Sequence, residues 1–253
     1  MAAYYNEHDK FAAQWLRNLI AEGHIAPGEV DERDIQDVKA DDLKGFTQCH
    51  FFAGIGGWSV ALRYAGWEDD KHVWTGSCPC QPLSSAGHQK GHADDRHLWP
   101  AFFNLISEQR PTDILGEQVA SKLGREWYSG VRADLECVGY ASGAADLPAP
   151  CVGAPHIRPR LWWCATDNYG TRLPKWDEPG NPRTPSTIFD AWSEFKRVHA
   201  ACAWASREDQ SDVRVFVDGI RGRVGQVRGY GNAIPPALAA EFIRAYTEVI
   251  CEL

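Results

Sequence analysis

Long apolar runs, a secretory leader and a disulfide-type cysteine spacing are all missing from this 253-residue sequence. No apolar stretch approaches the roughly 20 residues that a membrane span needs. Residues 1–7 lack the basic stretch and the apolar segment of a signal peptide. Eight cysteines without a framework-like spacing suit a reducing compartment better than a disulfide scaffold. We therefore expect a cytoplasmic protein that does not bind membranes.

Positive charge is also scarce, because the formal net charge is −8. The excess of 34 Asp and Glu over 26 Lys and Arg disfavours binding to nucleic acid phosphates. The charge is uneven, however: residues 151–230 hold 12 Lys and Arg against 9 Asp and Glu, and the remainder holds 14 against 25. A basic segment on an acidic body is compatible with DNA bound on one side only. Chance variation along the chain is the alternative explanation.

Short strands alternate with helices along most of the chain, and this alternation predicts an α/β sheet. The expected strands lie near residues 4–5, 35–38, 49–52, 72–76, 113–117, 140–147 and 160–164. The expected helices cover residues 11–20, 58–65, 98–108, 124–138 and 236–250. Residues 166–220 are polar and show little periodicity, so we expect an irregular region there.

The segment from Thr75 to Gly87 is chemically the most informative. It begins at the end of an expected strand and holds two thiols, Cys78 and Cys80, on either side of Pro79, which limits backbone freedom. A cysteine fixed just after a strand is well placed as a nucleophile, and the small polar residues that follow could close over a substrate. The alternative is that both cysteines are small buried hydrophobic residues, as most free cysteines are.

The run Pro79-Cys80-Gln81 followed by Ser84 closely resembles the catalytic loop of the cytosine-C5 DNA methyltransferases. In that family the loop reads Pro-Cys-Gln, a hydrophobic residue, Ser and a Gly-containing tail. By this alignment Cys80, not Cys78, is the nucleophile. The resemblance also implies contacts to DNA from Gln81, Ser84 and Arg96.

The run from Phe52 to Gly57 is a glycine-rich turn between an expected strand and an expected helix. Glycines let the backbone approach a ligand closely, and a helix N-terminus offers free amides. Such a turn alone is a weak signal, because doubly wound folds share it without sharing a ligand. In the family that the catalytic loop resembles, it binds S-adenosylmethionine, which implies cofactor contacts from Phe52, Gly54, Ile55 and Gly57. His50 stands where the family usually has Asp.

The acidic segments that follow this turn in the family are displaced here. Only 22 residues separate Gly57 from Cys80, too few for two further strand–helix units. Residues 5–12 resemble the family's ribose-binding strand end, and residues 33–38 resemble its adenine-binding segment. The resemblance thus implies a local transposition of cofactor segments to a position ahead of the glycine-rich turn.

In this transposed pocket Glu7 would accept hydrogen bonds from both ribose hydroxyls, and Asp34 would accept one from the adenine amino group. His8 and Ile35, beside them, belong to the same cofactor-binding segments. The transposition requires a strand ending at Tyr5 to lie next to the strand ending at Phe52. A solvated surface Glu and a helix-capping Asp are the alternatives.

Three more segments extend the resemblance. The run Gly116-Glu117-Gln118-Val119 matches the Glu-Asn-Val segment, residues 153–160 match Gly-x-Pro-Gln-x-Arg-x-Arg, and residues 231–235 match the last cofactor segment. The implied roles are contact with cytosine N3 and its exocyclic amine by Glu117, contact with O2 by Arg160, bracing of the site by Arg158, and cofactor contacts by Asn232 and Ala233.

Two departures accompany these matches, since Gln118 replaces Asn and His156 replaces Gln. Gln118 keeps an amide but changes its reach. For the two arginines, Arg158 and Arg160, the alternative is one solvated face of an edge strand.

The family's properties imply a Rossmann-like S-adenosylmethionine-dependent methyltransferase fold. Residues 1–165 with 221–253 would form the catalytic and cofactor-binding domain, and residues 166–220 a small target-recognition region. The expected activity is methylation at C5 of a cytosine flipped out of double-stranded DNA by a monomeric enzyme, of the kind found in prophages and restriction–modification systems.

Three other functions compete with this prediction. A zinc module could use Cys78, Cys80, His88, His92 and His97, but Cys-x-Cys is not the usual structural spacing, so no metal is expected. A catalytically inactive DNA-binding relative is disfavoured because the catalytic residue types are all present. A tRNA cytosine-C5 methyltransferase of the same family would use the same residues.

Overall fold

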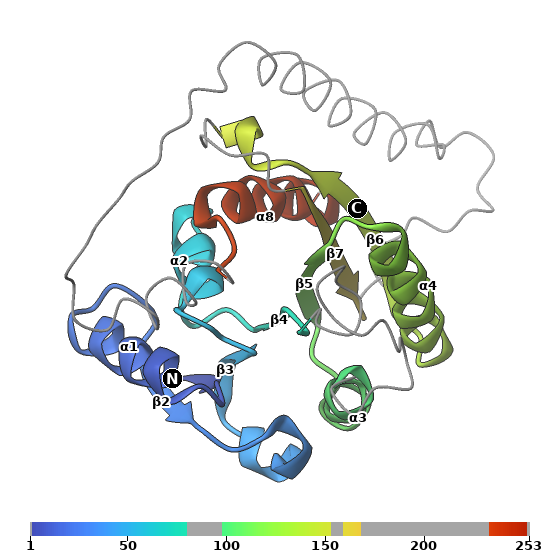
Figure 1. Ribbon diagram of the computed structural model, residues 1–253. Coiled ribbons are helices and arrows are strands. Elements are labelled where there is room, and N and C mark those ends of the chain that lie inside the picture. The colour runs from blue at the N-terminus through green and yellow to red at the C-terminus, as the bar shows by residue number, and fades with distance from the viewer. Residues whose placement is uncertain (1, 80–97, 153–158, 168–232, 252–253) are drawn as a thin grey trace.

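The structure, a computed structural model, describes residues 2–79, 98–152, 159–167 and 233–251 (Figure 1). Several predicted site residues fall outside these ranges: Cys80, Gln81, Ser84, Arg96, Arg158 and Asn232. The predicted target-recognition region also falls outside them, except for its first two residues.

Within the described residues, the core of the fold is a seven-stranded sheet of order β2-β1-β3-β4-β5-β7-β6. The strands from β1 to β5 are parallel, whereas β7 runs antiparallel to both β5 and β6. The strands are β1 (Ala2–Asn6), β2 (Gly28–Asp31), β3 (Phe46–Phe51), β4 (Val73–Gly76), β5 (Asp113–Val119), β6 (Ala141–Leu147) and β7 (Arg160–Thr166). A mixed α/β sheet, as the alternating pattern predicted, is confirmed.

Helices cover both faces of this sheet and make three layers (Figure 1). One face packs against α3 and α4, together with the short 3-10 helices η1 and η2; the other packs against α1, α2 and α8. A third short 3-10 helix is η5 (Ala149–Val152). The bounds are α1 (Lys10–Ala21), η1 (Ile35–Asp37), η2 (Ala40–Leu43), α2 (Gly57–Tyr64), α3 (Trp99–Gln109), α4 (Lys122–Cys137) and α8 (Pro236–Cys251).

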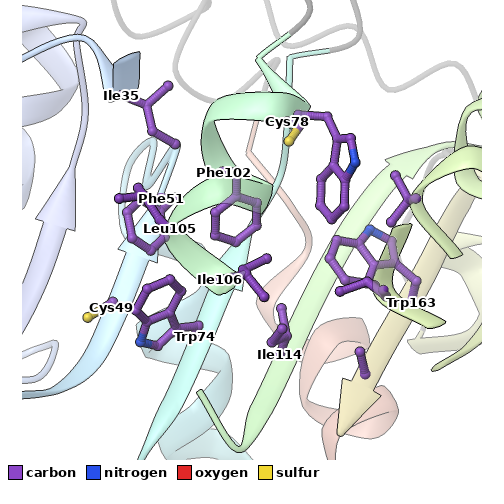
Figure 2. Packing of buried hydrophobic residues seen from close by; sticks show 14 of the residues in the cluster. Ile35, Cys49, Phe51, Trp74, Cys78, Phe102, Leu105, Ile106, Ile114 and Trp163 are labelled. Carbon is purple, nitrogen blue, oxygen red and sulfur yellow. The ribbon is translucent and has the colours of Figure 1, made fainter. Parts of the chain in front are cut away.

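The larger hydrophobic core lies under α3 and is rich in aromatic rings. Figure 2 shows Phe102 of this helix between Phe51 on β3 and the Trp163 region of β7. The rings of Phe51 and Phe102 lie 4.9 Å apart, and Phe102 is fully buried. This aromatic layer fixes α3 on the sheet.

Two features of the segment between α1 and β3 differ from the prediction. A strand, β2, forms at residues 28–31 where a loop was expected. The strand expected at residues 35–38 is wrong, because Ile35–Asp37 is a 3-10 helix. Ile35 and Val38 are both buried, and side chains three residues apart lie on one side of a 3-10 turn.

The chain makes one crossover of unusual hand. The connection from β1 to β2 through α1 steps one way along the sheet, and the connection from β3 to β4 through α2 steps the other way on the same face. The connections from β2 to β3 and from β4 to β5 pass over the opposite face and match the first in hand. Since about 98% of parallel crossovers are right-handed, the β3–α2–β4 connection is the left-handed exception.

No helix in the described part of the chain is long and apolar enough to cross a membrane.

Candidate active site

The candidate site lies where the parallel strands end. Open α/β sheets bind ligands beyond the carboxyl ends of their strands. Glu7 follows β1, the glycine-rich turn follows β3, Ser77 follows β4, and Glu117 is near the end of β5. Four neighbouring strands therefore place polar groups together at their carboxyl ends.

Glu7 links the first strand to the glycine-rich turn. Its Oε2 accepts a hydrogen bond from the Gly54 amide at 2.7 Å, and its Oε1 accepts one from the Asp9 amide at 2.8 Å. Burial raises the pKa of the Glu7 carboxyl above its usual value, and these two amides oppose the shift. Glu7 is thus a partly buried carboxylate held by backbone amides, not a solvated surface residue.

The strand arrangement behind this contact confirms the neighbour relation that the transposition requires. Strand β1 pairs in parallel with β3, and Tyr5 lies opposite His50. Their rings stack with centroids 4.9 Å apart. The turn after β3 and the residue after β1 consequently emerge side by side.

The glycine-rich turn has the conformation of a close-approach loop. Gly54 and Gly56 have φ angles of 56° and 83°, a region that favours glycine. Phe52 has φ of 53°, unusual for a residue with a side chain, and such outliers gather at ligand-binding sites. A Cβ atom on Gly57 would lie 2.8 Å from Cγ1 of Ile234, so the segment before α8 packs directly behind the turn.

Asp34 and Ile35 have clear structural positions. The Asp34 Oδ1 accepts a hydrogen bond from the Gln36 amide at 3.0 Å and so caps the short helix η1. Ile35 is buried in the core beneath α3, whereas His8 is exposed (Figure 2). The capping alternative for Asp34 is therefore present in the structure, on the segment that follows β2 next to β1.

These residues fit a nucleoside cofactor. A carboxylate with raised pKa, a turn with two left-handed glycines and the N-terminus of α2 meet within one stretch of the sheet edge. A carboxylate suits ribose hydroxyls, and free helix amides suit polar ligand groups. Ala233, which precedes Ile234, lies in the segment behind the turn.

Glu117 and Arg160 form an ion pair on adjacent strands. The Nε atom of Arg160 lies 2.5 Å from Oε1 of Glu117, and their side chains are only 18% and 10% exposed. The pair forms because β7 runs antiparallel to β5, which places Val119 opposite Arg160 and Glu117 opposite Trp162. The structure thus brings together two residues that are 43 positions apart, and the solvated-face alternative does not hold for Arg160.

The two cysteines of the loop have separate settings. Cys78 is buried in the core beside α3, and burial raises the pKa of its thiol, so it stays protonated near neutral pH (Figure 2). The next residue, Pro79, is exposed, and Cys80 lies outside the described residues. Just before them, Ser77 Oγ accepts a hydrogen bond from Trp58 Nε1 at 3.0 Å, which ties the end of β4 to α2. The buried-hydrophobe reading therefore describes Cys78.

Two of the positions that depart from the family pattern, His50 and Gln118, are buried. His50 is 1% exposed, its Nδ1 lies 2.8 Å from Thr75 Oγ1, and burial lowers its pKa to about 3, so it is neutral. Gln118 uses its Oε1 to accept from the Val119 amide, and its Nε2 is buried without a partner among the described residues. His156 lies outside the described ranges, as do four of the five residues considered for zinc.

Asn6, the last residue of β1, is a polar residue of this site that the sequence patterns did not single out. It is 3% exposed, and its side-chain amide donates to the Arg33 carbonyl at 2.9 Å. A polar residue between a buried Tyr and an acidic strand end is the available sequence signal. Such residues have to find partners when buried.

Comparison with known proteins agrees with this geometry. The model of the family described as C-5 cytosine-specific DNA methylase matches residues 67–200. Type II methyltransferase M.NgoMIV of Neisseria gonorrhoeae is 33% identical over 133 residues, which are 50% of this chain and 42% of the relative. Type II methyltransferase M.AplI of Arthrospira platensis is 33% identical over 190 residues, 61% of this chain and 54% of the relative. The chain spans about half the length of these relatives.

Among solved structures, the methyltransferase EhMeth of Entamoeba histolytica superposes with a TM-score of 0.55 at 12% identity. The match covers 97% of this chain and 90% of that one. At this identity the likeness concerns the fold alone, and it agrees with a Rossmann-like sheet.

Proposed function

Because the chain belongs to the C-5 cytosine-specific DNA methylase family, we propose that it transfers a methyl group from S-adenosylmethionine to C5 of cytosine in double-stranded DNA. The observation that carries this proposal is the Glu117–Arg160 pair at the carboxyl end of β5. A carboxyl group and a guanidinium held together in a partly buried place can contact N3 and O2 of one pyrimidine ring.

Cytosine C5 does not attack a methyl group without activation. The Cys80 thiolate adds to C6, and the new bond gives C5 carbanion character. Negative charge then develops on N3 and O2, where Glu117, protonated or sharing a proton with N3, stabilises N3 and Arg160 donates to O2. Arg158 braces this arrangement. After methyl transfer a base removes the C5 proton, and the electron pair released to the ring expels Cys80.

The cofactor binds at the carboxyl ends of β1, β2 and β3, which lie on one side of the Glu117–Arg160 pair. When bound, S-adenosylmethionine supplies an electrophilic methyl group. Glu7 accepts from the ribose hydroxyls, Asp34 accepts from the adenine amine, and amides of the turn after Phe52 surround the remainder. The contributing residues are Glu7, His8, Asp34, Ile35, Phe52, Gly54, Ile55, Gly57, Asn232 and Ala233. The contact between Glu7 and Gly54 supports this assignment, because it joins two of the segments.

The target base has to leave the duplex, since a stacked cytosine cannot reach a nucleophile at the sheet edge. Contacts from Gln81, Ser84 and Arg96 hold the flipped strand, the latter two through phosphates. Residues 166–220 serve target recognition, and their Lys and Arg residues contribute charge to that region.

Methyl transfer to duplex DNA, measured beside transfer to tRNA, tests the proposal directly. Expression of the chain in a host without cytosine methylation, followed by sequencing of that DNA for 5-methylcytosine, also reveals the target. We expect the wild type to produce 5-methylcytosine in the DNA and Cys80→Ala to produce none. Transfer to tRNA alone would overturn the proposed substrate.

A further inference from the structure

Three segments meet at the cofactor end of the sheet, and each comes from a different strand. Glu7 follows β1, the Asp34 segment follows β2, and the glycine-rich turn follows β3. In this chain the strand in the middle is β1, because β2 and β3 pair with its two edges. Its last residue, Asn6, is therefore the point from which both neighbours can be reached.

Asn6 forms hydrogen bonds with the chain that follows each of the two neighbouring strands. Its carbonyl accepts a hydrogen bond from the Ala53 amide at 3.0 Å, in the glycine-rich turn. Its side-chain Nδ2 donates to the Arg33 carbonyl at 2.9 Å, and it lies 3.4 Å from the Asp31 carbonyl. The backbone amide of Glu7, the next residue, donates a hydrogen bond to the Asp31 carbonyl at 2.9 Å.

Of these contacts, those made by the Asn6 side chain with the Arg33 and Asp31 carbonyls depend on residue type. A backbone carbonyl and a backbone amide are present whatever residue stands at position 6. The carboxamide of Asn6 supplies two N–H donors, and an aliphatic side chain at this buried position would leave the carbonyl of Arg33 without this partner.

We propose that Asn6 is a positioning residue for the cofactor, whose side chain holds the Arg33–Asp34 backbone at a fixed distance from Glu7. This inference rests on the proposed function, because it concerns the same S-adenosylmethionine site. Asn6 acts through Asp34 and Glu7 and touches no reacting atom. Its loss lets the segment after β2 move away from the strand end, so the two acidic residues no longer match one nucleoside.

A second side-chain hydrogen bond to the segment between β2 and β3 provides a matched control. Gln109 at the end of α3 also donates a side-chain amide to a backbone carbonyl, that of Ala40, at 2.8 Å. The two bonds hold the same stretch between β2 and β3, but the second anchors η2, beyond Asp34. Gln109→Leu therefore removes a bond of the same kind without releasing the Arg33–Asp34 backbone.

Isothermal titration with S-adenosylmethionine compares the wild type, Asn6→Leu, Asn6→Ser and Gln109→Leu, after thermal melting has established which variants fold. Both Asn6 variants are expected to raise Kd at least tenfold, and Gln109→Leu less than twofold. In turnover assays on DNA the Asn6 variants raise KM for the cofactor, while kcat at saturating cofactor stays within about twofold. A merely destabilising change would lower the melting temperature of both sets without this split.

The outcomes separate the two proposals. If the wild type binds S-adenosylmethionine and the Asn6 variants bind it equally well, the positioning role is wrong and the proposed function stands. Equal weakening by Gln109→Leu would also overturn the positioning role. If Asn6→Leu does not fold, the smaller Asn6→Ser decides. A wild type that does not bind S-adenosylmethionine would remove both proposals.

Discussion

Buried acidic residues at the strand ends are stabilised in two different ways. Glu7 receives hydrogen bonds from backbone amides of Asp9 and Gly54. Glu117 is paired with the guanidinium of Arg160. A buried carboxylate is costly unless it is hydrogen-bonded or paired. The amides leave Glu7 with acceptor capacity for hydroxyls, whereas the guanidinium gives Glu117 a fixed direction.

Replacement of Glu117 by Gln tests the pair at the reacting base. Glu117→Gln keeps the size of the side chain but removes a carboxyl group that can take up and release a proton. We expect kcat to fall by about 10²–10³, the usual loss when one group that stabilises developing charge is removed. The KM for S-adenosylmethionine should stay unchanged, because Glu7 and the glycine-rich turn are untouched. Steady-state kinetics on methylatable DNA measure both, and an unchanged kcat would remove Glu117 from catalysis.

The raised pKa of Glu7 gives cofactor binding a pH dependence of defined sign. As pH falls through this pKa, Glu7 takes up a proton and becomes a poorer acceptor for ribose hydroxyls, so affinity decreases. Folding responds in the opposite direction: the folded state binds this proton more tightly than the unfolded state, so the contribution of Glu7 to stability is lost as pH rises through the folded pKa.

Binding and melting measured across the acidic range compare the wild type with Glu7→Gln, which does not titrate. The wild type should bind the cofactor increasingly more tightly than Glu7→Gln as the pH rises toward neutrality. Over the same range the melting temperature of the wild type should fall relative to that of Glu7→Gln. Glu7→Ala removes the acceptors altogether and should cost about 1–3 kcal/mol of binding, roughly 5- to 150-fold in Kd. Parallel curves for wild type and Glu7→Gln would contradict a titrating Glu7.

The two neighbouring cysteines should respond very differently to substitution. Cys80→Ala is expected to abolish methyl transfer and leave S-adenosylmethionine binding intact, because in the proposed mechanism Cys80 acts on the base. Cys78→Ala should retain most activity, since its thiol is buried in the core and its pKa is raised. Activity assays and cofactor titration of both variants are sufficient, and the reverse pattern would mean that the loop alignment is off by two residues.

At the scale of elements, the sequence predicted those with strong patterns and missed those shaped by neighbours. Strand β5, with its buried Ile114 and Leu115, matches its expected range closely. Strand β2 is a four-residue edge strand whose Gly-Glu-Val-Asp sequence holds a single apolar side chain, too short a pattern to predict a strand, and it forms because β1 offers a free edge. The segment at Ile35 carries two buried residues three apart, which a short window cannot distinguish from a strand.

The left-handed crossover follows from the face on which α2 packs and from the place of β4 in the sheet. Helix α2 begins at the glycine-rich turn and packs on the same face as α1 and α8. From that face the chain has to reach β4, on the side of β3 away from β1. The hand of this connection is the consequence of these two placements. No local sequence pattern encodes handedness, so the sequence could not predict it.

The junction between α2 and α8 makes a prediction at this scale. Gly57→Ala would place a Cβ atom 2.8 Å from Ile234, whose branched side chain is stiff, so we expect a loss of about 1–3 kcal/mol from overpacking. Gly130→Ala on α4 is the matched control, because no atom lies within 4 Å of the added Cβ, and it should stabilise the helix by about 0.5–1 kcal/mol. Chemical denaturation measures both, and equal effects would contradict the close packing of α8 against the turn.

At the scale of the whole molecule, the site depends on the order of strands in the sheet and not on their order in the chain. Strand β1 lies between β2 and β3, with Tyr5 fully buried, so the N-terminal residues are part of the interior. The sequence resemblance singled out the segments proposed to bind the cofactor, and strand pairing explains why they meet. The Glu117–Arg160 contact needed the antiparallel register of β5 and β7, which the sequence did not specify.

Covalent trapping tests all parts of the site together. Duplex DNA with 5-fluorocytosine at a target site should form an adduct that survives denaturation. Fluorine at C5 cannot leave as a proton, so the elimination that frees Cys80 stalls after methyl transfer. The adduct should require S-adenosylmethionine, and it should be missing with Cys80→Ala. Slower trapping is expected with Glu117→Gln, because the charge on the ring loses a stabilising group.

Gel electrophoresis under denaturing conditions detects the adduct, and mass spectrometry of the attached peptide locates it. A duplex that carries ordinary cytosine at the same site is the control, since the wild type should methylate it and release it. If the enzyme methylates that control duplex but forms no adduct with the fluorinated one, the covalent mechanism is wrong, although the family and the cofactor site remain. An adduct at Cys78 would contradict the assignment of Cys80 as the nucleophile, although the structure buries the Cys78 thiol in the core.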